Sequence, residues 1–131
     1  MSRIYFAAPL FCDMELERNV KECTLLEEAG HTVYLPQRDG GEASKGIDRA
    51  ILFNRDVEAL EECDIVVAYF DGRVPDEGMC FEIGYGYARG KQIFIVSTDQ
   101  RSFEDGVPNA MLLYAGAWVK STQEVLKALE G

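Results

Sequence analysis

The residue of this sequence best suited to covalent chemistry is Glu82. It follows an apolar run at residues 65–70 that is typical of a buried strand. A loop comes next, in which Gly78 can end the turn so that the following residues begin a helix. Glu82 is therefore predicted near the start of that helix, where the positive end of the helix dipole favours an ionised carboxylate at neutral pH. An ionised, positioned carboxylate can act as a covalent nucleophile. It can also serve only to offset the dipole.

A tyrosine is placed where its phenol can reach such a carboxylate. Tyr5 lies near the carboxyl end of a predicted strand at residues 3–8. A hydrogen bond from its hydroxyl would fix the orientation of Glu82. The alternative is an ordinary core tyrosine.

A second carboxylate, Asp56, lies in a predicted helix at residues 47–62. It comes four residues after Leu52 and three after Phe53, which puts it on the apolar stripe that faces the sheet. Burial disfavours the charged form and raises the pKa of a carboxyl group, which suits Asp56 to proton donation. The alternative is a structural hydrogen bond to a backbone amide or to Arg55.

Two acidic residues, Asp76 and Glu77, come just before the helix of Glu82. Either can cap that helix, and for Glu77 capping is the preferred interpretation. Carboxylates this close to Glu82 would discourage an anionic ligand and favour one that offers hydrogen-bond donors.

Two amide side chains lie in other loops. Gln37 opens a polar, glycine-containing loop predicted at residues 37–46, where its amide can contact a ligand. Asn109 begins a short predicted helix at residues 109–114 and can be an ordinary cap of that helix.

Composition restricts the class of protein and of ligand. The 131 residues fit one domain over 1–131, and 47% of them are hydrophobic, enough for a core without metal or disulfide support. Against 23 acidic residues there are only 13 basic ones, so the net charge is −10. This charge argues against DNA, RNA or an anionic membrane surface as a partner, but not against small neutral ligands.

The cysteines and the apolar runs indicate the compartment. Cys12, Cys23, Cys63 and Cys80 form no CxxC pair and show no metal-like spacing with His31. No apolar stretch approaches the roughly 20 residues that span a bilayer, and no signal peptide opens the chain. We therefore expect a cytoplasmic protein with reduced cysteines, no metal site and no membrane association.

Strand and helix patterns alternate along the whole chain, which indicates an α/β fold with a parallel sheet covered on both faces. Five strands fit a flavodoxin-like (Rossmann-like) three-layer sandwich of order 2-1-3-4-5. The strands are predicted at residues 3–8, 32–35, 64–70, 92–97 and 117–119, and the helices at 13–29, 47–62, 79–90, 109–114 and 122–129. In that order the ligand crevice lies beyond the carboxyl ends of strands one and three, close to Glu82.

With these residues gathered, the chain resembles the nucleoside 2-deoxyribosyltransferase family from its first strand to the helix at residues 109–114. The resemblance is carried by Ile4-Tyr5-Phe6, Asn54-Arg55-Asp56, Asp76 with Gly78, Glu82-Ile83-Gly84-Tyr85 and Asn109-Ala110-Met111. The C-terminus departs from it. Some members place a C-terminal carboxylate in the active site, but the sequence does not place the last helix, before Leu129-Glu130-Gly131, against the crevice.

The resemblance implies a role for each matching residue. Glu82 is the nucleophile that attacks the anomeric carbon, and Tyr5 orients it. Asp56 and Asp76 contact the base, and one of them helps to protonate it as it leaves. Asn109 reaches the sugar 5′-hydroxyl from a neighbouring subunit, so the site requires a homo-oligomer (dimer, tetramer or hexamer). The further substrate contacts implied are Gln37, Gly78 and Met111.

The implied reaction is a retaining, ping-pong transfer of 2-deoxyribose between nucleobases through a glycosyl-Glu82 intermediate. The partners are small deoxynucleosides and nucleobases, and no cofactor or metal is implied. Water in place of the second base would give slow hydrolysis.

Two rival interpretations stay open. A 2′-deoxynucleoside 5′-monophosphate N-glycosidase would have the same scaffold but needs a phosphate site, to which Asp76 and Glu77 are poorly suited. A non-enzymatic flavodoxin-like binding module needs a hydroxyl-rich phosphate loop after the first strand, and residues 9–12 have no hydroxyl group. A phospho-receiver needs an acidic pair there, and Asp13 is alone.

Overall fold

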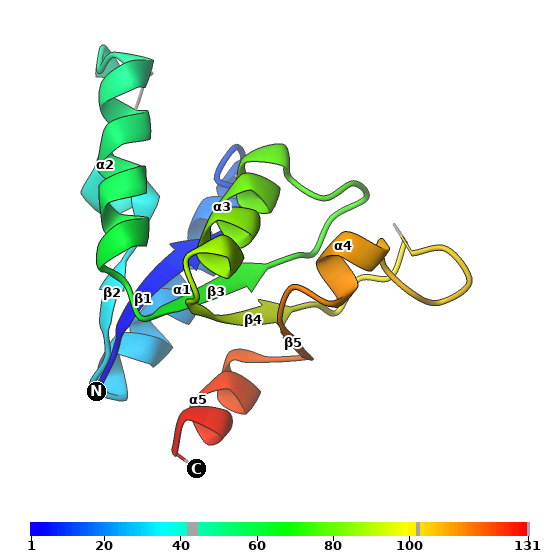
Figure 1. Ribbon diagram of the computed structural model, residues 1–131. Coiled ribbons are helices and arrows are strands. Elements are labelled where there is room, and N and C mark those ends of the chain that lie inside the picture. Colours follow the sequence, from blue (N-terminus) through cyan, green and yellow to red (C-terminus); the bar gives the residue numbers. More distant parts are fainter. Residues whose placement is uncertain (42–44, 102, 131) are drawn as a thin grey trace.

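The computed structural model describes residues 1–41, 45–101 and 103–130, which form a twisted sheet flanked by helices (Figure 1). Five strands pair in parallel in the order β2-β1-β3-β4-β5, as predicted. They are β1 (Arg3–Ala7), β2 (Thr32–Tyr34), β3 (Ile65–Tyr69), β4 (Gln92–Val96) and β5 (Ala117–Val119). This is the predicted flavodoxin-like arrangement.

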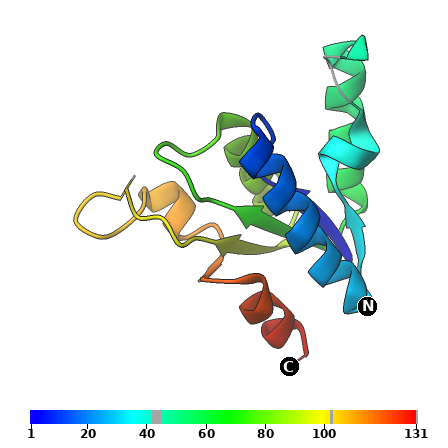
Figure 2. The same ribbon diagram turned by 180° about the vertical axis from the view of Figure 1, so that it is seen from behind.

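The helices cover both faces of this sheet, which completes the three layers. The helical segments are α1 (Asp13–Glu28), the π-helix η1 (Pro36–Gly40), α2 (Arg49–Glu62), α3 (Glu77–Ala88), α4 (Ala110–Leu113) and α5 (Thr122–Glu130). Helices α2 and α3 lie on the face turned toward the viewer in Figure 1. Helices α1 and α5 lie on the opposite face, seen in Figure 2.

Alternation along β1 decides which helices each of its side chains meets. Ile4 and Phe6 pack in the core beneath α1 and α5, with Leu26 and Val125. Tyr5 and Ala7 point the other way, into the core beneath α2 and α3. Because successive side chains of a strand point to opposite faces, the phenol of Tyr5 is directed toward the helix that carries Glu82.

Two predicted boundaries differ from those of the structure, at the start of the Glu82 helix and in the loop at residues 37–46. The helix of Glu82 begins at Glu77, so Gly78 lies inside its first turn. The left-handed backbone of the preceding loop is at Gly72, with φ of 144°. The predicted loop at residues 37–46 contains the π-helix η1 in its first part, and positions 42–44 lie outside the described residues.

No described helix has both the length and the apolar character to cross a membrane. No group of three or more His, Cys, Asp or Glu side chains among the described residues is arranged to hold a metal ion.

Candidate active site

Glu82 and Tyr5 meet on the face of the sheet covered by α2 and α3. The hydroxyl of Tyr5 donates a hydrogen bond to Oε2 of Glu82. The Tyr5 side chain is completely buried, so its ring is fixed by the surrounding core. The carboxylate of Glu82 is thereby held in one orientation by a residue of strand β1.

A glycine one helical turn further on allows this approach of α3 to the sheet. A Cβ added at Gly86 would lie 2.9 Å from both Ile93 Cδ1 and Val66 Cγ2. Met79 and Ile83 are buried on the same side of α3. The helix therefore rests closely on β3 and β4, and Glu82 is directed inward to β1.

The pKa of Glu82 corrects the expectation that this carboxylate is ionised at neutral pH. Burial, opposed by the Tyr5 hydrogen bond and reinforced by Asp56 and Asp76, raises the pKa of Glu82 to about 8. Glu82 is the sixth residue of α3, beyond the first turn in which the helix dipole acts strongly. That prediction is wrong because exclusion of water outweighs the dipole, and Glu82 is mostly protonated at pH 7.

Tyr5 remains a hydrogen-bond donor throughout the physiological range. Burial, followed by the nearby Glu82 and Asp56 carboxylates, raises the pKa of the Tyr5 phenol far above its usual value. Its proton therefore stays on the phenol oxygen, directed at Glu82.

Asp56 approaches Glu82 from α2 and is partly buried, as predicted. Phe53, which was expected on the same inward stripe, is instead 56% exposed. Burial raises the pKa of Asp56, although a hydrogen bond from Tyr34 acts in the opposite direction. The Tyr34 hydroxyl donates to Asp56 Oδ1 at 2.9 Å. Arg55 is not the partner, because its Nη1 donates to the carbonyl oxygen of Gly40 at 3.0 Å.

Asp76, and not Glu77, caps α3. Its carboxylate accepts a hydrogen bond from the backbone amide of Met79 at 2.9 Å, whereas Glu77 is an exposed first residue of the helix. Asp76 is nevertheless close enough to raise the pKa of Glu82. Asp76 therefore caps α3 and also forms, with Glu82 and Asp56, the carboxylate cluster of this site.

The structure does not bring Gln37 to this cluster. Its Oε1 accepts a hydrogen bond from Asn19 Nδ2 at 3.0 Å, and its Nε2 donates to the carbonyl oxygen of Leu16 at 3.1 Å. Both ends of the amide are thus engaged with α1, on the other side of the sheet. Gln37 is not free to contact a base in this conformation.

Asn109 and Met111 lie at the exposed start of α4. The Asn109 side chain accepts a hydrogen bond from the backbone amide of Met111 at 2.9 Å, so it is the cap of this short helix. Met111 is 82% exposed. Within one chain, no hydrogen bond of the described residues joins either of them to Glu82.

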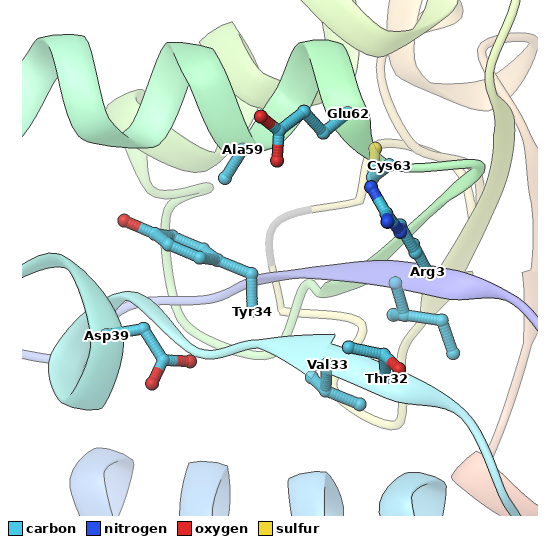
Figure 3. A pocket seen from close by; sticks show the side chains of 9 residues that line it. Arg3, Thr32, Val33, Tyr34, Asp39, Ala59, Glu62 and Cys63 are labelled. Atoms are coloured by element: carbon cyan, nitrogen blue, oxygen red, sulfur yellow. The ribbon is translucent and has the colours of Figure 1, made fainter.

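Tyr34 is the residue of this site that sequence reasoning missed. It is the parallel register partner of Tyr5 in the neighbouring strand, and the two rings stack with centroids 5.4 Å apart. Figure 3 shows Tyr34 extending from β2 along a cavity of about 340 Å³, with its hydroxyl turned away from Arg3. The available signal was strand pairing, because a residue level with Tyr5 on the next strand faces the same helices.

Comparisons with known proteins show what this chain is similar to. A family model described as nucleoside 2-deoxyribosyltransferase matches residues 4–128. A protein of Thermofilum pendens named putative 2′-deoxynucleoside 5′-phosphate N-hydrolase 1 is 34% identical over 102 residues, which cover 76% of this chain and 70% of that protein.

Solved structures show the same fold. A conserved protein from Enterococcus faecalis has a TM-score of 0.82 at 24% identity, covering 99% of this chain and 98% of that chain. A 2-deoxyribosyltransferase from Bacillus psychrosaccharolyticus has a TM-score of 0.79 at 27% identity, covering 95% of this chain and 90% of that chain. With a family model that spans nearly the whole chain, this protein belongs to the nucleoside 2-deoxyribosyltransferase family, whose enzymes act on N-glycosidic bonds.

Proposed function

We propose that this protein transfers a 2-deoxyribosyl group between nucleobases, with Glu82 as the covalent nucleophile. The observation that supports the proposal most strongly is the hydrogen bond from the buried Tyr5 hydroxyl to the Glu82 carboxylate. It leaves one carboxylate oxygen, Oε1, for attack on an anomeric carbon. A positioned carboxylate with a fixed orienting partner is the arrangement that covalent glycosyl transfer requires.

In the first half-reaction Glu82 attacks C1′ of the deoxynucleoside. The C1′–N bond breaks, its electron pair goes to the base nitrogen, and Asp56 supplies the proton that the departing base takes. In the second half-reaction a different base attacks C1′ and displaces Glu82, while Asp56 recovers a proton from the incoming base. Two inversions give net retention at C1′.

The two carboxyl groups suit this division of roles because Asp56 influences the ionisation of Glu82. Asp56 raises the pKa of Glu82, and burial raises the pKa of Asp56 itself. Such a pair favours a state in which the two groups share one proton. The productive form has that proton on Asp56 and an ionised Glu82.

A neutral nucleoside fits the charges of this site better than a nucleotide. Among the described residues, the charged groups that shift the pKa of Glu82 or Tyr5 are all acidic. A 5′-phosphate would therefore meet repulsion from the carboxylate cluster, unless cations from another part of the assembly compensate it.

Hydrolysis of 2′-deoxynucleoside 5′-monophosphates is the second candidate. It is supported by the 34% identity to a relative whose name describes a 5′-phosphate N-hydrolase. Product analysis separates the two functions. The protein is incubated with adenine and either 2′-deoxyinosine or 2′-deoxycytidine, and separately with the matching 5′-monophosphates. A new deoxynucleoside indicates transfer, whereas free 2-deoxyribose or its 5-phosphate alone indicates hydrolysis.

We further infer a homo-oligomer whose active site is shared. Asn109 and Met111 project from an exposed helix end, where they are available to a neighbouring subunit. In this arrangement Asn109 contacts the 5′-hydroxyl in the neighbour's site, and Gly78 lies beside Asp76 near the base. We also propose a cytoplasmic location, because the four cysteines are free and a reducing compartment keeps thiols in that state.

Trapping of the intermediate tests the nucleophile directly. A 2′-fluorinated deoxynucleoside analogue should leave a glycosyl adduct on the peptide that contains Glu82, seen by mass spectrometry. The Glu82→Ala variant should give no adduct. An adduct on another residue, or none on the wild type, contradicts the proposal.

A further inference from the structure

Two neighbouring strands each present a tyrosine to the same face of the sheet. Tyr5 of β1 and Tyr34 of β2 are register partners, and their rings stack at a 20° interplanar angle. Each phenol donates a hydrogen bond to one carboxylate, Tyr5 to Glu82 of α3 and Tyr34 to Asp56 of α2. The site therefore contains two parallel phenol–carboxylate pairs, and the proposed function has used only the first.

We propose that Tyr34 is a positioning residue for base protonation, holding Oδ1 of Asp56 so that the transferable proton is carried by Oδ2. This inference rests on the proposed function, in which Asp56 is the acid for the departing base. An oxygen that accepts a hydrogen bond at 2.9 Å is the poorer place for the acid proton. The proton leaves from Oδ2 to the base nitrogen as the C1′–N bond breaks, and the resulting carboxylate keeps its bond from Tyr34.

The backbone of η1 is shaped around this pair. Gly40 is buried, and a Cβ added there would lie 2.8 Å from the Tyr34 hydroxyl oxygen and 2.9 Å from Asp56 Oδ1. Its carbonyl oxygen accepts the hydrogen bond from Arg55, one residue before Asp56 on α2. The segment therefore covers the hydrogen bond on one side and ties it to α2.

The Tyr34 hydroxyl can be removed without disturbing much of the core. The residue is only partly buried, and its ring borders the cavity of Figure 3. Tyr34→Phe keeps the ring that stacks on Tyr5 and deletes only the donor to Asp56. Tyr87→Phe is the matched control, because Tyr87 is 63% exposed on the outer side of α3.

The test compares two substrates that differ in their need for a proton. The base of 2′-deoxyinosine, or of 2′-deoxycytidine if that is the one released, requires protonation on leaving. The 4-nitrophenolate of a 4-nitrophenyl 2-deoxyribofuranoside leaves as a stable anion and takes no proton. Release is followed in single turnovers for the wild type and for Tyr34→Phe, Asp56→Asn and Tyr87→Phe.

A positioning role gives a selective loss. Tyr34→Phe should slow release of the natural base about tenfold or more. Its substrate concentration at half-saturation and its rate of nitrophenolate release should both stay within about twofold of the wild type. Asp56→Asn should show the same selectivity with a larger loss, and Tyr87→Phe should match the wild type. The double variant Tyr34→Phe/Asp56→Asn should be no slower than Asp56→Asn, since Tyr34 acts through Asp56.

A second variant repeats the test if Tyr34→Phe folds poorly. Gly40→Ala pushes a methyl group between the Tyr34 and Asp56 oxygens and should give the same selective loss. Gly84→Ala is its control, because a Cβ at Gly84 meets no atom within 4 Å.

Other results overturn the inference in distinguishable ways. The positioning role of Tyr34 is excluded if Tyr34→Phe has wild-type rates or loses equally on both substrates. If Asp56→Asn still shows a selective loss in that case, the proposed function stands. An unselective Asp56→Asn removes Asp56 as the acid and overturns both. Release of base by Glu82→Ala at the wild-type rate would refute the proposed mechanism itself.

Discussion

The phenol of Tyr5 and the carboxylate of Glu82 form a hydrogen bond that joins residues 77 positions apart in the sequence. It connects the second layer of the fold, the sheet, to the layer of α2 and α3. The bond lowers the pKa of Glu82, but burial outweighs it, and the resulting pKa is about 8. The ionisation of Glu82, the proposed nucleophile, is thus set mainly by the competition between one hydrogen bond and the exclusion of water.

Tyr5→Phe should shift the pH dependence of the reaction to higher pH. Without its donor, the ionised form of Glu82 loses stabilisation and its pKa rises above about 8, so a smaller fraction is ionised at neutral pH. We expect the acid limb of the pH profile of kcat/KM for base release to move to higher pH. Activity at neutral pH should fall about 10- to 100-fold. An unchanged acid limb in this variant would show that Tyr5 does not control Glu82.

Glu82→Gln should stabilise the fold, by an amount that grows as the pH rises. The folded-state pKa of Glu82, about 8, lies above its usual value of 4.5, so the wild type has its full stability below about 4.5 and loses stability progressively as the pH rises from there through 8. Glutamine does not titrate and can still accept the Tyr5 hydrogen bond. We expect the variant to exceed the wild type by about 1–3 kcal/mol near pH 8.5 and to differ little near pH 5.

Thermal or urea unfolding at the two pH values measures this difference. The control is Glu58→Gln on α2, because Glu58 is exposed and no hydrogen bond of the described residues involves its side chain. An equal gain at both pH values for Glu82→Gln would mean that the effect comes from packing, not from titration.

Asp56→Asn should slow base departure far more than it weakens binding. The amide keeps the shape of the side chain but cannot deliver the proton, which general acid catalysis makes worth about 10²- to 10⁴-fold in rate. We expect the single-turnover rate to fall within that range while the half-saturation concentration stays within about threefold. A rate equal to that of the wild type would remove Asp56 from the mechanism.

Mixing two inactive variants tests whether neighbouring subunits share the site. Glu82→Ala lacks the proposed nucleophile and Asn109→Ala lacks the proposed 5′-hydroxyl contact. Co-refolded as random dimers, half of the assemblies are mixed and each mixed dimer has one intact site of two, so about one quarter of wild-type activity should return. Activity no higher than the mean of the two separate variants would place each site within a single chain.

Two glycines of α3 give a matched test of how closely this helix rests on the sheet. Gly86→Ala should destabilise the protein by about 1–3 kcal/mol, because the new methyl group meets Ile93 and Val66 at 2.9 Å. Gly84→Ala has open space and should stabilise it by up to about 1 kcal/mol through helix propensity. Chemical denaturation of both variants measures the difference, and equal stabilities would contradict the close packing that directs Glu82 inward.

The fold could be predicted from the sequence alone because its signals are local. Alternating strand and helix patterns set a parallel sheet of order 2-1-3-4-5, and the topology set the edge where the site lies. The inward position of Asp56 also followed from helical spacing, and burial raises its pKa as expected. Each of these properties depends on the periodicity of neighbouring residues, which the sequence contains directly.

Other features were decided only by the tertiary structure. The pairing of Tyr34 with Asp56 depends on the registration of two strands and a helix, and the engagement of Gln37 with α1 depends on where η1 packs. The protonation of Glu82 was predicted wrongly because helix position can be read from the sequence, whereas exclusion of water from a carboxylate cannot. Burial is a property of the assembled layers, and here it outweighs the local helix dipole.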